Sequence, residues 1–179
     1  RTRLYTAGGI SSGGRAIGAF TVNAPGAPTI LDPLGLGSFF SSGQSPAYLT
    51  FTDDDSILFV GHGTDATVRS FLVNQQTGEL TETGYFFDVG LQGTIGDIAV
   101  MGDKLIIIDD STAIDGIYGV YVFQIHPDGN FTQMHPIVPT GTPRPEGRMA
   151  VWMGVGGTCE PDLTTGAVPG SAGYGVPNG

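Results

Sequence analysis

A strand-like pattern recurs about every fifty residues along this chain, and this spacing constrains the fold more than any other feature. Residues 18–23, 69–74 and 121–126 align, and the Phe residues at their centres lie 51 and 52 positions apart. A repeat of roughly 20 to 50 residues is typical of stacked or radial architectures. Such a period fits one four-stranded propeller blade. We therefore expect the aligned side chains to pack in the cores of successive blades; they are Phe20, Phe71 and Phe123.

The composition favours an all-β protein. Charged residues make up only 13% of the 179 residues, whereas the chain has 30 Gly and 12 Pro, which favours many turns between short strands. The net charge of −10 would repel phosphate backbones, so we expect no nucleic-acid partner. The longest apolar runs have the length of a strand. They fall far short of the roughly 20 residues of a membrane helix, so we expect no membrane span.

Each repeat divides into four predicted strands, named a to d from the centre of the ring outward. The chain supplies b, c and d, then two complete sets of a to d, and finally a single a, which amounts to three blades. Closed propellers have about 4 to 8 blades. We therefore expect further blades, from a missing portion of the same gene product or from a second copy of this chain, giving a six- or seven-bladed ring. The expected strands a lie at residues 46–52, 96–101 and 148–153, strands b at 4–7, 57–61 and 105–109, and strands d at 29–36, 80–87 and 131–138.

The chain divides into two predicted regions, with residues 1–153 forming propeller blades and residues 154–179 a Gly/Pro-rich tail or linker. It starts at Arg1, which indicates a processed chain or a piece of a longer one. The sequon at Asn130 is a glycosylation candidate or a chance triplet, and together with the low Lys content it favours a secreted, extracellular protein. Cys159 is the only cysteine, so it is a candidate for a disulfide to another chain, a free thiol or a buried side chain.

Two stretches of the second repeat carry a family resemblance. Residues 45–55 read Ser-Pro-Ala-Tyr-Leu-Thr-Phe-Thr-Asp-Asp-Asp and are followed by Ile-Leu-Phe-Val, while residues 67–73 read Thr-Val-Arg-Ser-Phe-Leu-Val and are followed by a Thr-Gly-Glu-Leu turn. This pattern resembles a blade of the lactonase-type propellers, which include phosphogluconolactonases and fungal carboxymuconate cyclases. The resemblance covers residues 1–153 and is weaker in the first and third repeats. It implies a lactone hydrolase or cycloisomerase that acts on a small carboxylated lactone.

Propeller ligands usually bind over the central channel, on the face that bears the d–a and b–c loops. Opening or closing a lactone beside a carboxylate needs a cation to hold the acid and a proton carrier near the ring oxygen. We therefore expect Arg144 and Arg148 to hold carboxylates, and His62 or Glu146 to move the proton. The resemblance implicates an Arg, a Glu and a His near the channel, although Pro145 stands where the family has the His after the Arg. Further substrate-binding candidates on these loops are Gln44, Gln92, Asp109 and Asp110.

Several of these residues have simpler explanations. The acidic run at residues 53–55 has the composition of a calcium site, but solvated Asp is ordinary on a hairpin turn, which we favour. Asp109 and Asp110 end a buried strand, where carboxylates either cap backbone donors or bind a cation. We expect no cofactor, because no phosphate-cradling loop or metal-binding set is present in the sequence. The alternative function is a non-catalytic propeller that binds a small molecule or glycan, such as an adhesin, a carbohydrate-binding protein or a structural surface protein.

Overall fold

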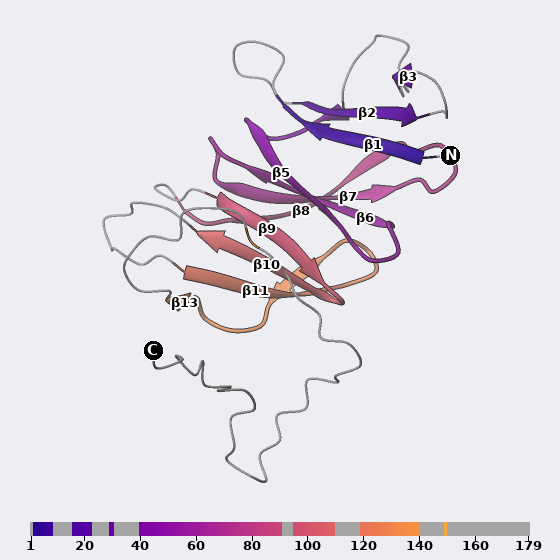
Figure 1. Ribbon diagram of the computed structural model, residues 1–179. Helices are drawn as coiled ribbons and strands as arrows, with labels where there is room; N and C mark the ends of the chain where they lie inside the picture. Colours follow the sequence, from indigo (N-terminus) through magenta and orange to yellow (C-terminus); the bar gives the residue numbers. More distant parts are fainter. Residues whose placement is uncertain are drawn as a thin grey trace, which may run out of the picture.

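The computed structural model describes residues 2–8, 16–22, 29–30, 40–90, 95–109, 119–139 and 149. This part of the chain contains strands and turns and no helix, so the predicted all-β fold is confirmed. It likewise offers no helix long and apolar enough to cross a membrane. The strands form three antiparallel sheets that follow one another along the chain and lie layer upon layer (Figure 1).

The three sheets, called sheets 1, 2 and 3 in chain order, have the predicted strand order. Sheet 2 is a complete blade in which each strand pairs with the next one in sequence, and sheet 3 repeats that order. Sheet 1 contains β1 (Thr2–Ala7), β2 (Ala16–Val22), β3 (Thr29–Ile30) and β4 (Phe40–Ser41). Sheet 2 contains β5 (Pro46–Phe51), β6 (Ile57–His62), β7 (Thr67–Val73) and β8 (Leu80–Asp88). Sheet 3 contains β9 (Ile95–Met101), β10 (Lys104–Asp109), β11 (Gly119–Ile125), β12 (Phe131–Gln133) and β13 (Val138–Pro139).

The outermost strands differ from the prediction. The prediction of one continuous strand at residues 131–138 is wrong. Two short strands, β12 and β13, lie there instead, and both pair with β11. His135 and Pro136 form a bend between them, so His135 lies outside the strand in which it was expected. Pro136 has no N–H to donate to the ladder. The Gln133 side chain donates to the His135 carbonyl at 2.7 Å and so holds the bend. Residues 31–36 and 150–153, also expected to form strands, lie outside the described residues.

Strand β6 of sheet 2 is buried on both of its faces. All six residues of β6 are buried. Its side chains alternate between the two faces, so that Ile57 and Phe59 pack in the core shared with sheet 3, while Leu58 and Val60 pack in the core shared with sheet 1. A strand that contributes to two cores cannot carry a polar alternation, which explains its continuous run of apolar residues.

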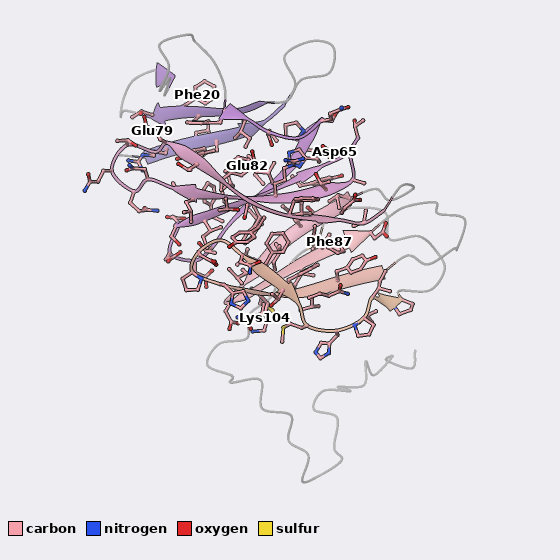
Figure 2. All side chains as sticks on the ribbon, turned by 180° about the vertical axis from the view of Figure 1, so that it is seen from behind. Phe20, Asp65, Glu79, Glu82, Phe87 and Lys104 are labelled. Atoms are coloured by element: carbon pink, nitrogen blue, oxygen red, sulfur yellow. The ribbon has the colours of Figure 1, made fainter. Side chains whose placement is uncertain are left out.

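The same pair of apolar residues recurs in all three sheets. A Leu on the predicted strand b lies opposite a Phe on strand c, and the pairs are Leu4–Phe20, Leu58–Phe71 and Leu105–Phe123. In sheets 2 and 3 the pair is at most 2% exposed and belongs to the core shared with the preceding sheet. In sheet 1 Leu4 is 46% exposed and Phe20 is half-buried. Figure 2 shows Phe20 on the side of sheet 1 that faces away from sheet 2. The expectation of a core position thus holds for two of the three Phe residues.

The outer face of sheet 3 is also apolar. Leu105 and Ile107 on β10 are buried against sheet 2, whereas Ile106 and Ile108 point the other way and are only half-buried. Val122 and Val120 lie opposite Ile106 and Ile108, giving a strip of four aliphatic side chains. Within the described residues β10 is therefore buried on one face, since they include no sheet beyond sheet 3.

Candidate functional site

The d–a and b–c loops lie on one face of the stack, here called the candidate face. On this face the innermost strands β5 and β9 begin, and their partners β6 and β10 end. Described polar residues that lie here include Gln44, His62, Asp65, Asp97 and Asp109. They come from two neighbouring sheets whose innermost strands are in contact. Within the described residues, the d–a loop before β5 and the b–c loop after β6 meet on this face.

His62 connects the loop before β5 to the loop after β6. It is fully buried, and its Nε2 accepts the backbone N–H of Gly43 at 3.0 Å and also contacts the Ser42 hydroxyl. Its Nδ1 lies 3.2 Å from the backbone carbonyl of Thr67. Because a carbonyl can only accept and the Gly43 amide can only donate, these partners assign the proton to Nδ1 and leave Nε2 as the acceptor.

The surroundings of His62 favour its neutral form. Burial lowers the pKa of His62 below its ordinary value of 6.5, and this effect outweighs the Asp65 carboxylate and the Thr67 carbonyl, which act in the opposite direction. A protonated ring would also place an N–H against the Gly43 amide N–H, which can only donate. His62 is thus held as a neutral side chain that joins two loops of the candidate face.

Asp65 strengthens the same connection. Its carboxylate accepts the backbone N–H of Gln44 at 2.9 Å and the Thr67 hydroxyl at 2.9 Å. A Cβ added to Gly43 would lie 2.6 Å from an Asp65 carboxylate oxygen and 2.9 Å from the His62 ring. Both distances are shorter than a carbon atom tolerates, so only glycine fits where the two loops approach each other. We refer to Ser42, Gly43, His62, Asp65 and Thr67 together as the loop clamp.

Asp97 marks the channel-side edge of the candidate face. It lies on β9, the innermost strand of sheet 3, and is buried. One carboxylate oxygen accepts the N–H of Ile98 at 2.9 Å, and the other accepts the N–H of Met149 at 2.5 Å. Asp97 and Met149 occupy equivalent positions of the predicted repeat, because each is the second residue of an expected strand a, at 96–101 and at 148–153. The structure therefore places Met149, the described residue of the last predicted strand a, beside the preceding one.

Asp109 ends β10 on the same face and is buried, as its position at the end of an apolar strand predicted. It faces the first residues of both neighbouring strands in the sheet, Ile95 on β9 and Gly119 on β11. Burial raises the pKa of the Tyr121 phenol, and the Asp109 charge raises it further. Gln44, by contrast, is exposed at the loop clamp.

The remaining predicted site residues lie outside the described residues. These are the catalytic candidates Arg144, Glu146 and Arg148, the substrate-binding candidates Gln92 and Asp110, and the disulfide candidate Cys159. The structure thus tests neither their roles nor their distances from Asp97 and His62. The predicted tail at residues 154–179 lies in the same part of the chain.

Within the described residues, no group of three or more His, Cys, Asp or Glu side chains is arranged to hold a metal ion. The acidic run at residues 53–55 forms a turn instead, as we favoured. The Asp54 carboxylate accepts the hydroxyls of Thr52 and Ser56 and the backbone N–H of Ser56 at 2.7 to 3.0 Å. These hydrogen bonds stabilise the charged form and lower the pKa of Asp54 to about 2.

The glycosylation candidate Asn130 lies on the opposite face, in the turn between β11 and β12. Its backbone carbonyl accepts the N–H of His126 at 2.9 Å, and its N–H donates to Asp128. His126 is therefore a hairpin residue. Its Nε2 lies 3.0 Å from the hydroxyl of Thr132, the third residue of the sequon.

Sequence reasoning missed Ser42, Gly43, Thr67 and Asp97. Asp97 had a detectable signal, because a charged residue inside a strand predicted to be innermost and apolar needs a partner. Ser42, Gly43 and Thr67 had none. They are small residues, and Thr67, more than 20 positions from the other two, comes near them because the start of β5 pairs with the end of β6.

Comparison with solved structures identifies the architecture. The chain is similar to a protein from Lactobacillus plantarum, with a TM-score of 0.58 and 17% identity over 73% of this chain and 38% of that one. It is also similar to proposed 6-phosphogluconolactonases from Bacteroides uniformis (TM-score 0.58, 17% identity, 71% of this chain and 36% of that one) and Bacteroides fragilis (TM-score 0.57, 20% identity, 73% and 37%). No protein-family model and no curated protein matches the chain.

These similarities confirm at the level of fold the resemblance that the second repeat carries. The matched regions correspond to a little over a third of the length of each solved structure. Sheets 2 and 3 repeat one four-stranded order, as successive blades of a propeller do. The chain therefore has the fold of the lactonase-type β-propellers, of which it spans only a part.

Proposed function

We propose that this chain supplies three blades of a propeller enzyme that opens or closes a small carboxylated lactone. The fold of the proposed 6-phosphogluconolactonases supports the reaction class. The observation that carries the proposal is the hydrogen bond from Met149 to Asp97. It brings the residue after Arg148 to the innermost strand of sheet 3, on the candidate face, which is where a group that contacts a ligand in the channel must lie.

The proposed roles follow from lactone chemistry. An arginine fork can hold a carboxylate through two parallel hydrogen bonds, and we assign this role to Arg144 and Arg148. Water attacks the lactone carbonyl with the help of a general base, and the ring oxygen leaves with a proton from the same or a second group. Gln44, Gln92 and Asp110 are proposed to line the substrate site, together with the buried carboxylate of Asp109.

Of the two proton carriers that the sequence offers, we propose Glu146 rather than His62. Both ring nitrogens of His62 have partners in the loop clamp, and the side chain has no exposed surface. Proton exchange with a substrate would require these hydrogen bonds to break. We therefore propose that His62 acts as a positioning residue, which fixes the loop that carries Gln44.

Further blades are part of this proposal. The Leu–Phe pair is buried by the preceding sheet in sheets 2 and 3 and lacks such cover in sheet 1. The aliphatic strip on the outer face of sheet 3 corresponds to the face by which sheet 2 covers sheet 3. Additional blades, from a longer version of this chain or from a second copy, would bury both surfaces and close the channel around the substrate. The candidate for a disulfide that joins such chains is Cys159.

We also propose that the protein is secreted and glycosylated at Asn130. The sequon lies at a hairpin end, where Asn130 is half-buried and Thr132 is exposed. A glycan on this turn would extend from the face opposite to the proposed catalytic site. It would therefore leave the channel mouth of the candidate face open to substrate.

The activity can be tested on the native protein with a panel of carboxylated γ- and δ-lactones, by following acid release in a pH-stat. We expect Glu146→Gln to lower kcat by about 10²- to 10⁴-fold, the usual contribution of a general acid or base. We expect Arg148→Ala chiefly to raise KM, because it removes binding of the substrate carboxylate. Arg69→Ala is the matched control, since Arg69 pairs with Glu82 at 2.8 Å away from the channel.

Two results would contradict the proposal. One is turnover that survives unchanged in Glu146→Gln and Arg148→Ala. The other is a native assembly that hydrolyses none of the lactones, and this result would favour the non-catalytic binding protein. A His62→Gln variant that retains kcat would support the positioning role of the loop clamp.

A further inference from the structure

A cavity lies on the face opposite to the candidate face, where the turns between β5 and β6 and between β7 and β8 approach the start of β1. It has a volume of about 620 Å³ and lies between sheets 1 and 2. Pockets for small ligands range from roughly 300 to 1,000 Å³. Its position at the other end of the blades makes it independent of the proposed catalytic site.

The floor of this cavity is aromatic and the rim is polar. Tyr5 and Phe51 line it with ring centroids 5.3 Å apart and ring planes inclined at 57°. Both rings pack against the core shared by sheets 1 and 2, which fixes their orientation. Arg3, Asp55 and Gln75 form the rim. A cavity with a rigid aromatic floor and polar groups around it can stack one face of a ring and hydrogen-bond its edge.

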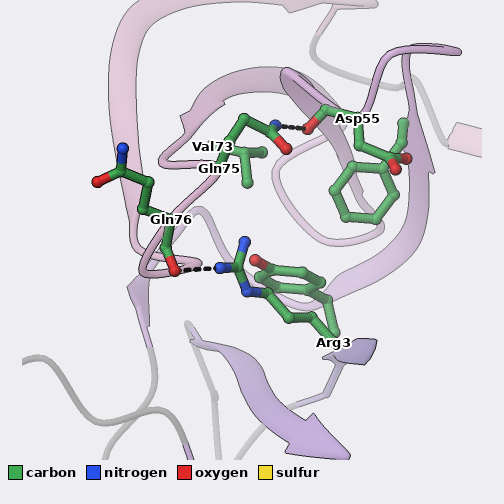
Figure 3. A pocket seen from close by; sticks show the side chains of 7 residues that line it. Arg3, Asp55, Val73, Gln75 and Gln76 are labelled. Atoms are coloured by element: carbon green, nitrogen blue, oxygen red, sulfur yellow. Dashed lines mark hydrogen bonds between the residues drawn. The ribbon is translucent and has the colours of Figure 1, made fainter. Parts of the chain in front are cut away.

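Hydrogen bonds hold the rim in place without a ligand. Arg3 donates to the backbone carbonyls of Asn74 at 3.2 Å and Gln76 at 2.5 Å. The Gln75 amide donates to the backbone carbonyl of Asp55 at 2.6 Å, and the Tyr5 hydroxyl donates to that of Gly78 at 2.8 Å. Figure 3 shows the Arg3 guanidinium directed at Gln76 and the Gln75 amide directed at Asp55 across the cavity. A site ordered in advance loses less entropy when it binds.

The charges of the rim favour a neutral ligand. Arg3 is a cation and Asp55 is an anion, so a charged ligand of either sign would meet one group of its own sign. The Arg3 guanidinium can only donate, and it already donates to two carbonyls, while the Asp55 carboxylate offers only acceptors. Hydroxyl groups both donate and accept, so a polyhydroxylated ring satisfies both sides of the rim.

The equivalent cavity between sheets 2 and 3 has different chemistry. It has a volume of about 560 Å³ and is lined by Asp53, Asp54, Asp103 and His126 among others. It contains neither an arginine nor an aromatic ring pair among its described lining residues. The repeat of the blade therefore accounts for a cavity at this position, whereas the aromatic floor and the Arg3 rim are particular to the cavity between sheets 1 and 2.

We propose that the cavity lined by Arg3, Tyr5, Phe51, Asp55 and Gln75 binds a neutral saccharide ring. The two aromatic rings contact the apolar face of the sugar. Arg3 and Gln75 donate to its hydroxyl oxygens, and Asp55 accepts from its hydroxyl groups. This would give the protein a glycan-binding surface on the face opposite to the channel mouth of the candidate face.

Saturation-transfer NMR on the native protein tests this site, with D-glucose, D-galactose, D-mannose and D-xylose as neutral probes and D-glucuronate and D-glucosamine as charged ones. We expect at least one neutral sugar to bind and both charged sugars to bind more weakly. Arg3→Ala, Gln75→Ala and Asp55→Asn should each weaken binding about five- to tenfold, the effect of losing one hydrogen bond. Asn is chosen at position 55 because the backbone φ there is 57°, which Asn tolerates.

Matched controls separate binding from folding. Arg69→Ala and Gln133→Ala remove the same side chains elsewhere on the described surface and should leave sugar binding unchanged. The proposal is overturned if no neutral sugar binds, if glucuronate or glucosamine binds best, or if all three cavity variants bind like the unmodified protein. We expect every one of these variants to leave the proposed lactone hydrolysis unchanged, because none of the substituted residues lies on the candidate face.

Discussion

At the scale of single residues, the loop clamp shows how a buried histidine can be structural. His62 has a lowered pKa in the folded protein because it is buried. In the unfolded chain the pKa of His62 returns to about 6.5. Between the folded and the unfolded pKa, the unfolded state therefore binds more protons than the folded state. The free energy of unfolding therefore rises with pH across that window. The contribution of neutral His62 is fully present above about pH 6.5 and is lost as the pH falls from there towards the folded pKa.

We predict that His62→Gln reduces this pH dependence. Urea unfolding between pH 7.5 and pH 5 should give a smaller slope for the variant, by at most about 1.4 kcal/mol per pH unit for one proton. The Asp54 carboxyl does not interfere, because its pKa is lowered to about 2, and its contribution is lost only at pH values below the ordinary carboxyl range. Equal slopes in the two proteins would refute the assignment of His62 as a neutral, buried group.

At the scale of strands, much of the architecture could be predicted, because two periods are superimposed in the sequence. The alternation within each strand and the fifty-residue repeat together located every strand of sheet 2 to within two residues at either end. The interruption between β12 and β13 was missed, because it depends on a bend at His135 and Pro136. The loop clamp was missed for a different reason, since its hydrogen bonds join loops that meet only where β5 pairs with β6.

The Leu–Phe pairs give a prediction at this scale. Phe71→Ala should lower the free energy of unfolding by about 3 to 5 kcal/mol, because it leaves a cavity in the core shared by sheets 1 and 2. Leu72→Ala is the control, since the Leu72 side chain points to the other face of the strand and is 39% exposed; we expect a loss below about 1 kcal/mol. Similar losses for the two variants in chemical denaturation would mean that Phe71 does not pack between the sheets.

At the scale of the whole molecule, the proposal of further blades rests on the two end sheets. Leu4 and Phe20 on sheet 1 repeat a pair that is buried elsewhere, and Ile106 and Ile108 on sheet 3 lie on a face that covers nothing in the described residues. Apolar surfaces of this kind usually mark an interface. The chain spans only a little over a third of the length of the solved propellers that it matches.

The mass of the native particle, measured by light scattering after size-exclusion chromatography, tests most directly whether these sheets are part of a larger ring. This chain has a mass of 18.5 kDa and supplies three blades. A particle with six or seven blades therefore has at least about twice that mass. We expect that mass with and without reductant if non-covalent packing holds the ring together. A compact monomer of 18.5 kDa that leaves Leu4 and Phe20 facing solvent would contradict the account.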